Sequence, residues 1–158
     1  MAQVKAFEWY QQNMPVAIPG MKADSTVDVV DSFAAEGGVN PGDLVIRGTD
    51  PANQCKTVTA ATLAAFAVGV AVHTHKDYSG EGAYYINGEA VPVMTFGDIC
   101  VGAGDDSITA GGQVYISNGT DNDVVYVSGG EGAVSVPGMS YLTDATAAGD
   151  IVVVRVRK

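Results

Sequence analysis

The stretch Pro41-Gly42-Asp43-Leu44-Val45 decides the fold through a short pattern: a small residue, glycine, aspartate or glycine, any residue, then valine. The pattern returns at Ala110-Gly111-Gly112-Gln113-Val114 and at Ala148-Gly149-Asp150-Ile151-Val152. Its glycine can adopt a positive φ, which lets the chain turn tightly before it re-enters a sheet. The copies are irregularly spaced, so they are not the units of a solenoid. Each copy therefore predicts a hairpin turn that leads into a strand.

The composition favours short strands joined by tight turns. Glycine supplies 20 of the 158 residues, hydrophobic residues make up 47% and charged residues only 16%. Globular domains usually carry about 25% charged residues. A domain of ~150 residues buries about 70% of its unfolded surface, so the chain can form a sizeable core. Short apolar segments between glycine-rich turns predict an all-β fold, either an antiparallel β-sandwich or a small β-barrel.

Hydrophobic periodicity places the individual strands. Residues 26–33 alternate apolar and polar side chains, and residues 151–156 form the clearest strand. Further strands are predicted over residues 44–46, 57–59, 66–72, 89–96, 99–101, 113–117, 124–127, 134–136 and 140–142, with one helical turn over residues 60–65. The predicted core consists mainly of valine: Val27, Val29, Val45, Phe66, Val68, Val70, Val114, Tyr115, Val125, Val152 and Val154.

The first part of the chain differs from the rest. We predict an extended N-terminal arm over residues 1–23, followed by one β-sandwich or β-barrel domain over residues 24–158. The residues expected to make contacts are three aromatic residues and two prolines of the arm: Phe7, Trp9, Tyr10, Pro15 and Pro19. Exposed aromatic surface is unfavourable at about 25 cal/mol per Å², so these rings should be buried against a protein surface. That surface is either the chain's own body or a neighbouring subunit.

Charge excludes several classes of partner. The chain carries a formal charge of −10, and between Asp24 and Val154 17 acidic residues outnumber three basic ones. Nucleic-acid binding depends largely on neutralising phosphates, so such a body should not bind nucleic acid. No apolar run approaches the ~20 residues of a membrane-spanning helix, and the first residues show no signal-peptide pattern. The basic ends of the chain could contact an acidic partner.

Residues suited to catalysis are few. His73 and His75 share a face of a strand, but only Asp77 lies nearby as a third ligand, so they are expected to be polar residues where a strand leaves the core. Cys55 and Cys100 are expected to be buried, inert thiols. No nucleophile or phosphate-binding motif is present. We therefore expect no enzyme activity, no catalytic residue, no cofactor and no metal.

Six segments carry a further signal through their order along the chain. They cover residues 17–25, 41–48, 66–75, 89–99, 110–115 and 147–157. Each alone is ordinary β-hairpin sequence, but the series resembles the structural cement (capsid decoration) proteins of tailed bacteriophages. The resemblance covers residues 15–158, and residues 1–14 have no counterpart in it.

This resemblance implies a jelly-roll-like β-sandwich or small β-barrel and a non-enzymatic virion protein. Such a protein would bind the outer surface of an icosahedral capsid and stabilise the lattice of the major capsid protein. The implied partners are the major capsid protein and neighbouring copies of the chain, arranged as a dimer or a trimer. We accordingly expect the arm residues Phe7, Trp9, Tyr10, Pro15 and Pro19 to contact the capsid or a neighbouring copy. The protein would be made in the host cytoplasm and reside on the outer capsid surface.

Two alternatives from other classes remain at this stage. A carbohydrate-binding or adhesin module would also be an acidic, glycine-rich β-sandwich, and Tyr78, Tyr84 and Tyr85 could stack on a sugar. Such a platform requires two or three exposed, coplanar rings on one face. A small metal-dependent enzyme would instead use His73 and His75.

Overall fold

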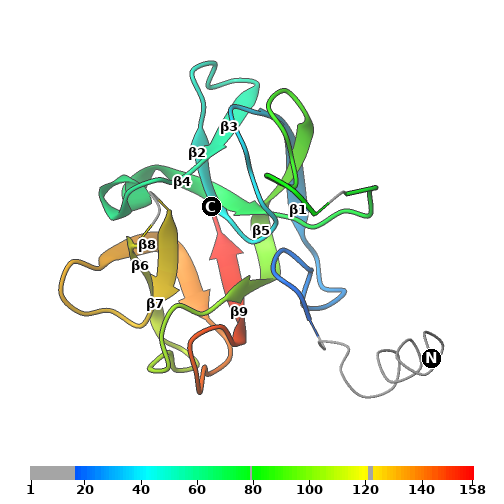
Figure 1. Cartoon of the computed structure of the whole chain (residues 1–158). Helices are drawn as coiled ribbons and strands as arrows, with labels where there is room; N and C mark the ends of the chain where they lie inside the picture. The colour runs from blue at the N-terminus through cyan, green and yellow to red at the C-terminus, as the bar shows by residue number, and fades with distance from the viewer. Residues whose placement is uncertain (1–16, 79, 121–122) are drawn as a thin grey trace, which may run out of the picture.

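The computed structural model describes residues 17–78, 80–120 and 123–158, and these residues form a nine-stranded sheet and a short 3-10 helix (Figure 1). The elements in chain order are β1 (Val29–Ala35), β2 (Leu44–Arg47), β3 (Gln54–Thr57), η1 (Ala61–Phe66), β4 (Ala67–Ala71), β5 (Ala90–Gly102), β6 (Gln113–Asn118), β7 (Val124–Val127), β8 (Val134–Tyr141) and β9 (Ile151–Arg157). The all-β prediction is therefore confirmed.

The first five strands close into a small barrel. Their order is β1-β3-β2-β4-β5, and β1 pairs again with β5 to complete the circle. All of these pairs are antiparallel except β1 with β3, which pair in parallel at Ala34 and Ala35. Closure pairs backbone groups that an open sheet would leave unpaired at its edges.

Strand β5 continues beyond this barrel into a second group of strands. Its 13 residues pair first with β1 and β4 and then with β9, after which β8, β6 and β7 follow in order. The second group curves back to β5, because Tyr126 of β7 forms a bridge with Ala103, directly after β5. Figure 1 shows the two groups of strands on either side of β5.

Glycine at position 97 permits the irregular course of β5. Gly97 has a φ of +134°, and a Cβ at this position would lie 2.8 Å from the Cβ of Asp28. Close by, the register between β1 and β5 shifts between Val29 and Val30. The sequence predicted separate strands at 89–96 and 99–101, whereas Gly97 allows one continuous strand.

The core consists of two clusters. One lies inside the five-stranded barrel, since every strand of that barrel contributes to it, among them Phe33, Val45 and Cys55. The other includes Leu44 and Ile46, whose side chains leave β2 on the face opposite Val45. Strand β2 is therefore buried on both faces, and it joins the two clusters.

Most of the predicted core is confirmed, with three corrections. Val45, Val70, Val114, Val152 and Val154 are fully buried, whereas Val68, Tyr115 and Val125 are half-buried. Three predicted core residues are instead exposed on the surface: Val27 by 81%, Val29 by 46% and Phe66 by 67%. Val27 precedes the first strand, Val29 begins it beside the register shift, and Phe66 ends η1. Among the described residues, no neighbouring segment covers any of the three.

The two cysteines behave as predicted. Both thiols are free and buried. Burial raises the pKa of Cys55 to about 11, and burial also raises the pKa of Cys100. Neither thiol is therefore ionised near neutral pH, which fits a packing role.

The approach of β4 to β5 gives a direct test of this packing. A Cβ at Gly69 would lie 2.2 Å from the carbonyl oxygen of Met94, whereas a Cβ at Gly102 would meet nothing within 4 Å. We expect Gly69→Ala to lower the free energy of unfolding by about 1–3 kcal/mol, because the strands must move apart. The matched control Gly102→Ala should change it by less than about 0.5 kcal/mol. Urea unfolding measures both values, and equal losses would contradict the described contact.

Candidate interaction surface

The described end of the arm is hydrogen-bonded to the body. The N–H of Gly20 donates to the carbonyl of Cys100 at 2.8 Å, and the N–H of Cys100 donates to the carbonyl of Met21 at 2.8 Å. The N–H of His73 donates to the carbonyl of Gly20, also at 2.8 Å. Gly20 is thus held between β5 and the chain that follows β4.

A close contact with the Pro41-Gly42 turn fixes the same point. A Cβ at Gly20 would lie 2.5 Å from the Cβ of Pro41, and a Cβ at Gly42 would lie 2.7 Å from the Cβ of Pro19. Both glycines have a positive φ. The turn that leads into β2 therefore also sets the place where the arm leaves the body.

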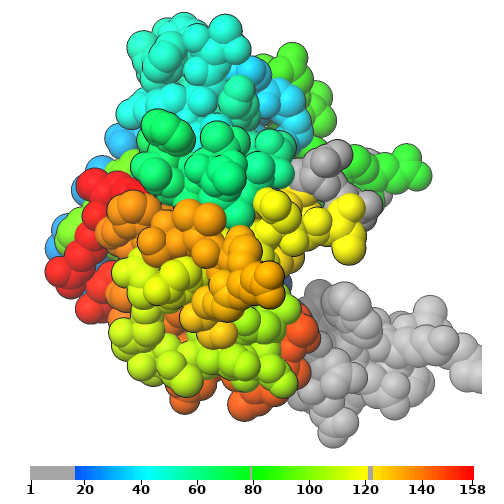
Figure 2. Space-filling view, turned by 90° about the vertical axis from the view of Figure 1, so that its left-hand side faces the viewer, coloured from blue at the N-terminus to red at the C-terminus, as the bar shows by residue number. Residues whose placement is uncertain are grey.

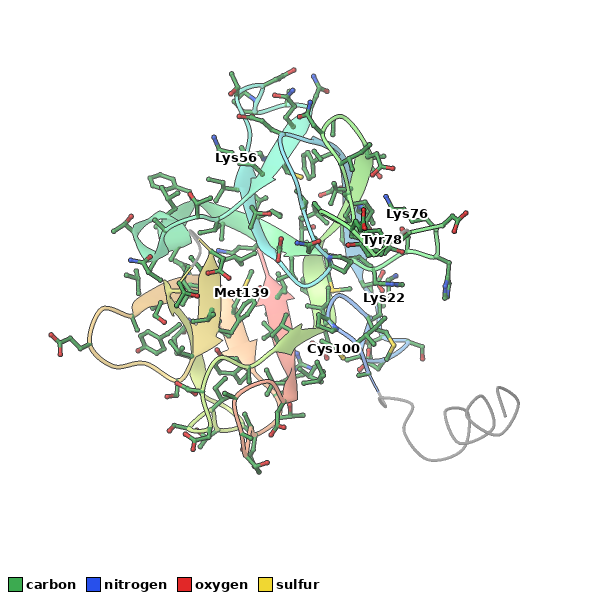
Figure 3. The ribbon with its side chains drawn as sticks, viewed as in Figure 1. Lys22, Lys56, Lys76, Tyr78, Cys100 and Met139 are labelled. Carbon is green, nitrogen blue, oxygen red and sulfur yellow. The ribbon has the colours of Figure 1, made fainter. Side chains whose placement is uncertain are left out.

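An apolar hollow of about 290 Å³ lies at this place. We call it the exit hollow, and its lining is Ile18, Pro19, Asn40, Pro41, His73, Tyr78 and Tyr84. In Figure 3, Lys22, Lys76 and Tyr78 lie on the same side of the molecule. The exit hollow can accept an apolar side chain of a partner.

A packed aromatic cluster forms one wall of the exit hollow. The ring of Tyr84 lies 5.1 Å from that of His73 and 5.0 Å from those of Tyr78 and Tyr85, measured between centroids. The Lys76 ammonium lies 5.0 Å from the Tyr84 centroid and 2.7 Å from the Glu89 carboxylate. The wall is therefore held in place by ring packing, a cation–π contact and an ion pair.

This geometry does not fit a sugar-binding platform. Tyr84 and Tyr85 are buried, at 9% and 2% exposure, and only Tyr78 is exposed, at 39%. The Tyr84 ring is inclined by 50° to Tyr78 and by 78° to Tyr85. The three rings are therefore neither coplanar nor exposed together, as carbohydrate stacking requires.

The two histidines lie at the rim of this cluster. Their ring centroids are 5.8 Å apart. Burial lowers the pKa of His73, and the neighbouring His75 lowers it further. The described residues contain no group of three His, Cys, Asp or Glu side chains that could hold a metal ion. That the histidines bind no metal stays a prediction.

Four of the five predicted contact residues, Phe7, Trp9, Tyr10 and Pro15, lie outside the described residues. The fifth, Pro19, is exposed and lines the exit hollow. Sequence reasoning missed the hollow itself, because Ile18, Pro41 and His73 come from distant segments. The tight Pro41-Gly42 turn was the available signal, but a turn pattern does not show what packs on it.

The fold is similar to that of a chain in a solved structure described as "The capsid of Myoviridae Phage XM1", with a TM-score of 0.71 and 19% identity. The likeness covers 93% of this chain and 94% of that chain. At this identity the likeness shows the fold. No curated protein matches the chain.

The fold defines a small all-β protein built from one closed barrel and a second group of strands. Residues 8–157 match the family described as "Structural cement protein (E217 gp24/Pam3 gp6)", and the chain belongs to this family. The family assignment gives the chain a structural role in a phage capsid. The match begins at residue 8, so it includes part of the segment for which the sequence resemblance offered no counterpart.

The two types of tyrosine in the cluster provide a test. The Tyr85 hydroxyl is buried and donates to the carbonyl of Val72 at 2.5 Å, whereas the exposed Tyr78 hydroxyl donates to that of Gly82 at 2.6 Å. We expect Tyr85→Phe to lower the free energy of unfolding by about 1–2 kcal/mol, because a buried acceptor loses a donor. Tyr78→Phe should lower it by less than about 0.5 kcal/mol. Thermal and urea unfolding measure both losses. A larger loss for Tyr78→Phe than for Tyr85→Phe would refute the assigned burial.

Proposed function

We propose that the chain binds the outer surface of an icosahedral phage capsid and stabilises the lattice of the major capsid protein. The family match over residues 8–157 is the observation that carries this proposal. The likeness to a chain of a phage capsid supports it. The role is structural and non-enzymatic, and the protein is located on the virion exterior after synthesis in the host cytoplasm.

The body suits a protein that must resist deformation. The five-stranded barrel is closed, and the second group of strands returns to β5 through the Tyr126 bridge. Bending such a body would break several ladders of hydrogen bonds at once. A rigid body that bridges capsid subunits would limit their relative movement.

Attachment depends on the arm in this proposal. Phe7, Trp9 and Tyr10 act as anchors, because aromatic residues often supply most of the energy of an interface. Pro15 and Pro19 restrict the conformations of the arm and lower the entropy lost on docking. Several arms on one oligomer would strengthen binding through valency.

The proposed partners are the major capsid protein and neighbouring copies in a dimer or trimer. Nucleic acid is not a proposed partner, since the body is strongly acidic. A membrane is not a proposed partner either. In the part of the chain that the structure describes, no helix has the length and apolar character needed to cross a membrane.

Deleting residues 1–14 tests the role of the arm. The hydrogen bonds of Gly20 to Cys100 and His73 remain in this variant, so we expect it to fold and stay soluble. It should no longer decorate expanded capsids, as measured by co-sedimentation. Trp9→Ala should weaken decoration by about tenfold or more, the expected effect of losing an aromatic anchor.

Glu8→Ala is the matched control, because it changes the same segment without removing a ring. It should affect decoration less than Trp9→Ala does. If the truncated chain bound expanded capsids as tightly as the full chain, the arm would have no role in attachment. If the full chain itself bound no capsid, the proposed function would be wrong.

A further inference from the structure

A row of exposed side chains crosses three neighbouring strands, β1, β5 and β9. Val29 of β1 lies opposite Phe96 of β5, and Phe96 lies opposite Arg157 of β9. Directly opposed residues of neighbouring strands share a face of the sheet. Val29 is 46% and Phe96 40% exposed, and nearby Val27 is 81% exposed. At the left edge of Figure 2, the red surface of the C-terminal strand adjoins blue and green surface from earlier residues.

Three of these residues, Val27, Phe96 and Arg157, line a hollow of about 250 Å³. We call it the arginine hollow, and its other lining residues are Thr26, Gly97, Asp98, Arg155 and Val156. Gly97 belongs to this lining at a point where the chain packs closely on Asp28. The lining of the hollow therefore includes both apolar side chains and the side chains of two arginines.

The two arginines differ in their bonding. Arg155 donates two hydrogen bonds, each 2.8 Å long, to the carboxylate of Asp98, which is buried. This pairing raises the pKa of Arg155. Arg157 is exposed and forms no salt bridge within the described ranges. Its guanidinium group is thus available to a partner.

Apolar walls and an available guanidinium group together fit an aromatic ring. Arginine stacks on aromatic faces, most favourably on tryptophan, and Phe96 can pack against another ring. Contiguous exposed apolar side chains of this kind mark an interaction site. The sequence contains a single tryptophan, Trp9, in the arm. We propose that Trp9 of a second copy of the chain packs in the arginine hollow.

This inference rests on the proposed role of the arm and names its binding site. The course of the chain favours a second copy over the chain's own arm. Gly20 bonds to Cys100, Ala23 bonds to Asp98, and Val29 pairs with Phe96, so the chain approaches the hollow as it runs forward. Gly20, the held base of the arm, therefore lies beside Cys100 and not beside Phe96 at the hollow.

Length and charge also allow the arm to reach a second copy. The 16 residues before Ala17 can span about 50 Å when extended, against a radius of gyration of about 15 Å for a domain of this length. Residues 1–16 contain one basic and one acidic side chain, Lys5 and Glu8. Two acidic bodies repel each other, but an arm without net side-chain charge can approach the acidic body of another copy.

The single tryptophan makes the proposal measurable by fluorescence of the full chain. We expect the emission of Trp9 to shift to shorter wavelength as the protein concentration rises. Phe96→Ser should raise the concentration at the midpoint of this shift by about tenfold or more, the effect of losing an anchor at an interface. Val27→Ser should also raise this midpoint concentration. Val27 lines the hollow but lies before β1, so this variant changes no residue of a strand. Phe66→Ser is the matched control, since Phe66 is an exposed phenylalanine on η1.

Mixing two variants distinguishes a second copy from the same chain. Trp9→Ala keeps the hollow but has no tryptophan, and Phe96→Ser keeps Trp9 but has a damaged hollow. We expect the emission of the Phe96→Ser chain to shift when the Trp9→Ala chain is added. No shift on mixing, or a shift of the full chain that does not depend on concentration, would overturn the proposal. A shift that occurs only when expanded capsids are added would also overturn it but would leave the proposed function intact.

Discussion

The hydrogen bonding of β5 on both of its edges is the constraint on which the rest of the structure depends. Its first half pairs with β1 and β4, and its second half pairs with β9 and bonds to residues 20–23. The barrel, the second group of strands and the base of the arm therefore share one strand. Asp98 lies within it, and the two hydrogen bonds from Arg155 compensate the burial of its charge.

This arrangement relates the two candidate contact surfaces to each other. The exit hollow lies where residues 18–20 meet the chain after β4, and the arginine hollow lies beside Phe96 and Gly97. The exit hollow is lined by residues between strands and is connected to β5 through the Gly20–Cys100 hydrogen bond, whereas the arginine hollow is lined in part by residues of β5 and β9 themselves. A body of this kind can hold an arm at one point and receive an arm at another. Successive copies could then be connected at a constant spacing, which suits an ordered lattice.

Much of the fold could be predicted because its signals are local. The turn pattern at Pro41-Gly42 and the valine-rich runs identified most strands, and the buried cysteines followed from their residue type. Val27 and Val29 were predicted in the core from alternation, and Phe66 from the apolar run over residues 66–72. Neither signal shows whether a distant segment covers the side chain. The continuity of β5 depends on a positive φ at Gly97, and periodicity does not reveal backbone angles. The exit hollow combines distant segments, so no local pattern indicates it.

The central claim is that this β scaffold occupies the outside of the capsid and is attached through its arm. The most direct measurement is a cryo-electron microscopy reconstruction of virions, or of expanded capsids decorated with the full chain, at a resolution that shows side chains. The account predicts the two packed groups of strands on the outer surface, with the arm traced into contact with another subunit. Density for the body on the inner surface, or an arm packed wholly on its own body with Trp9 touching no other chain, would contradict it.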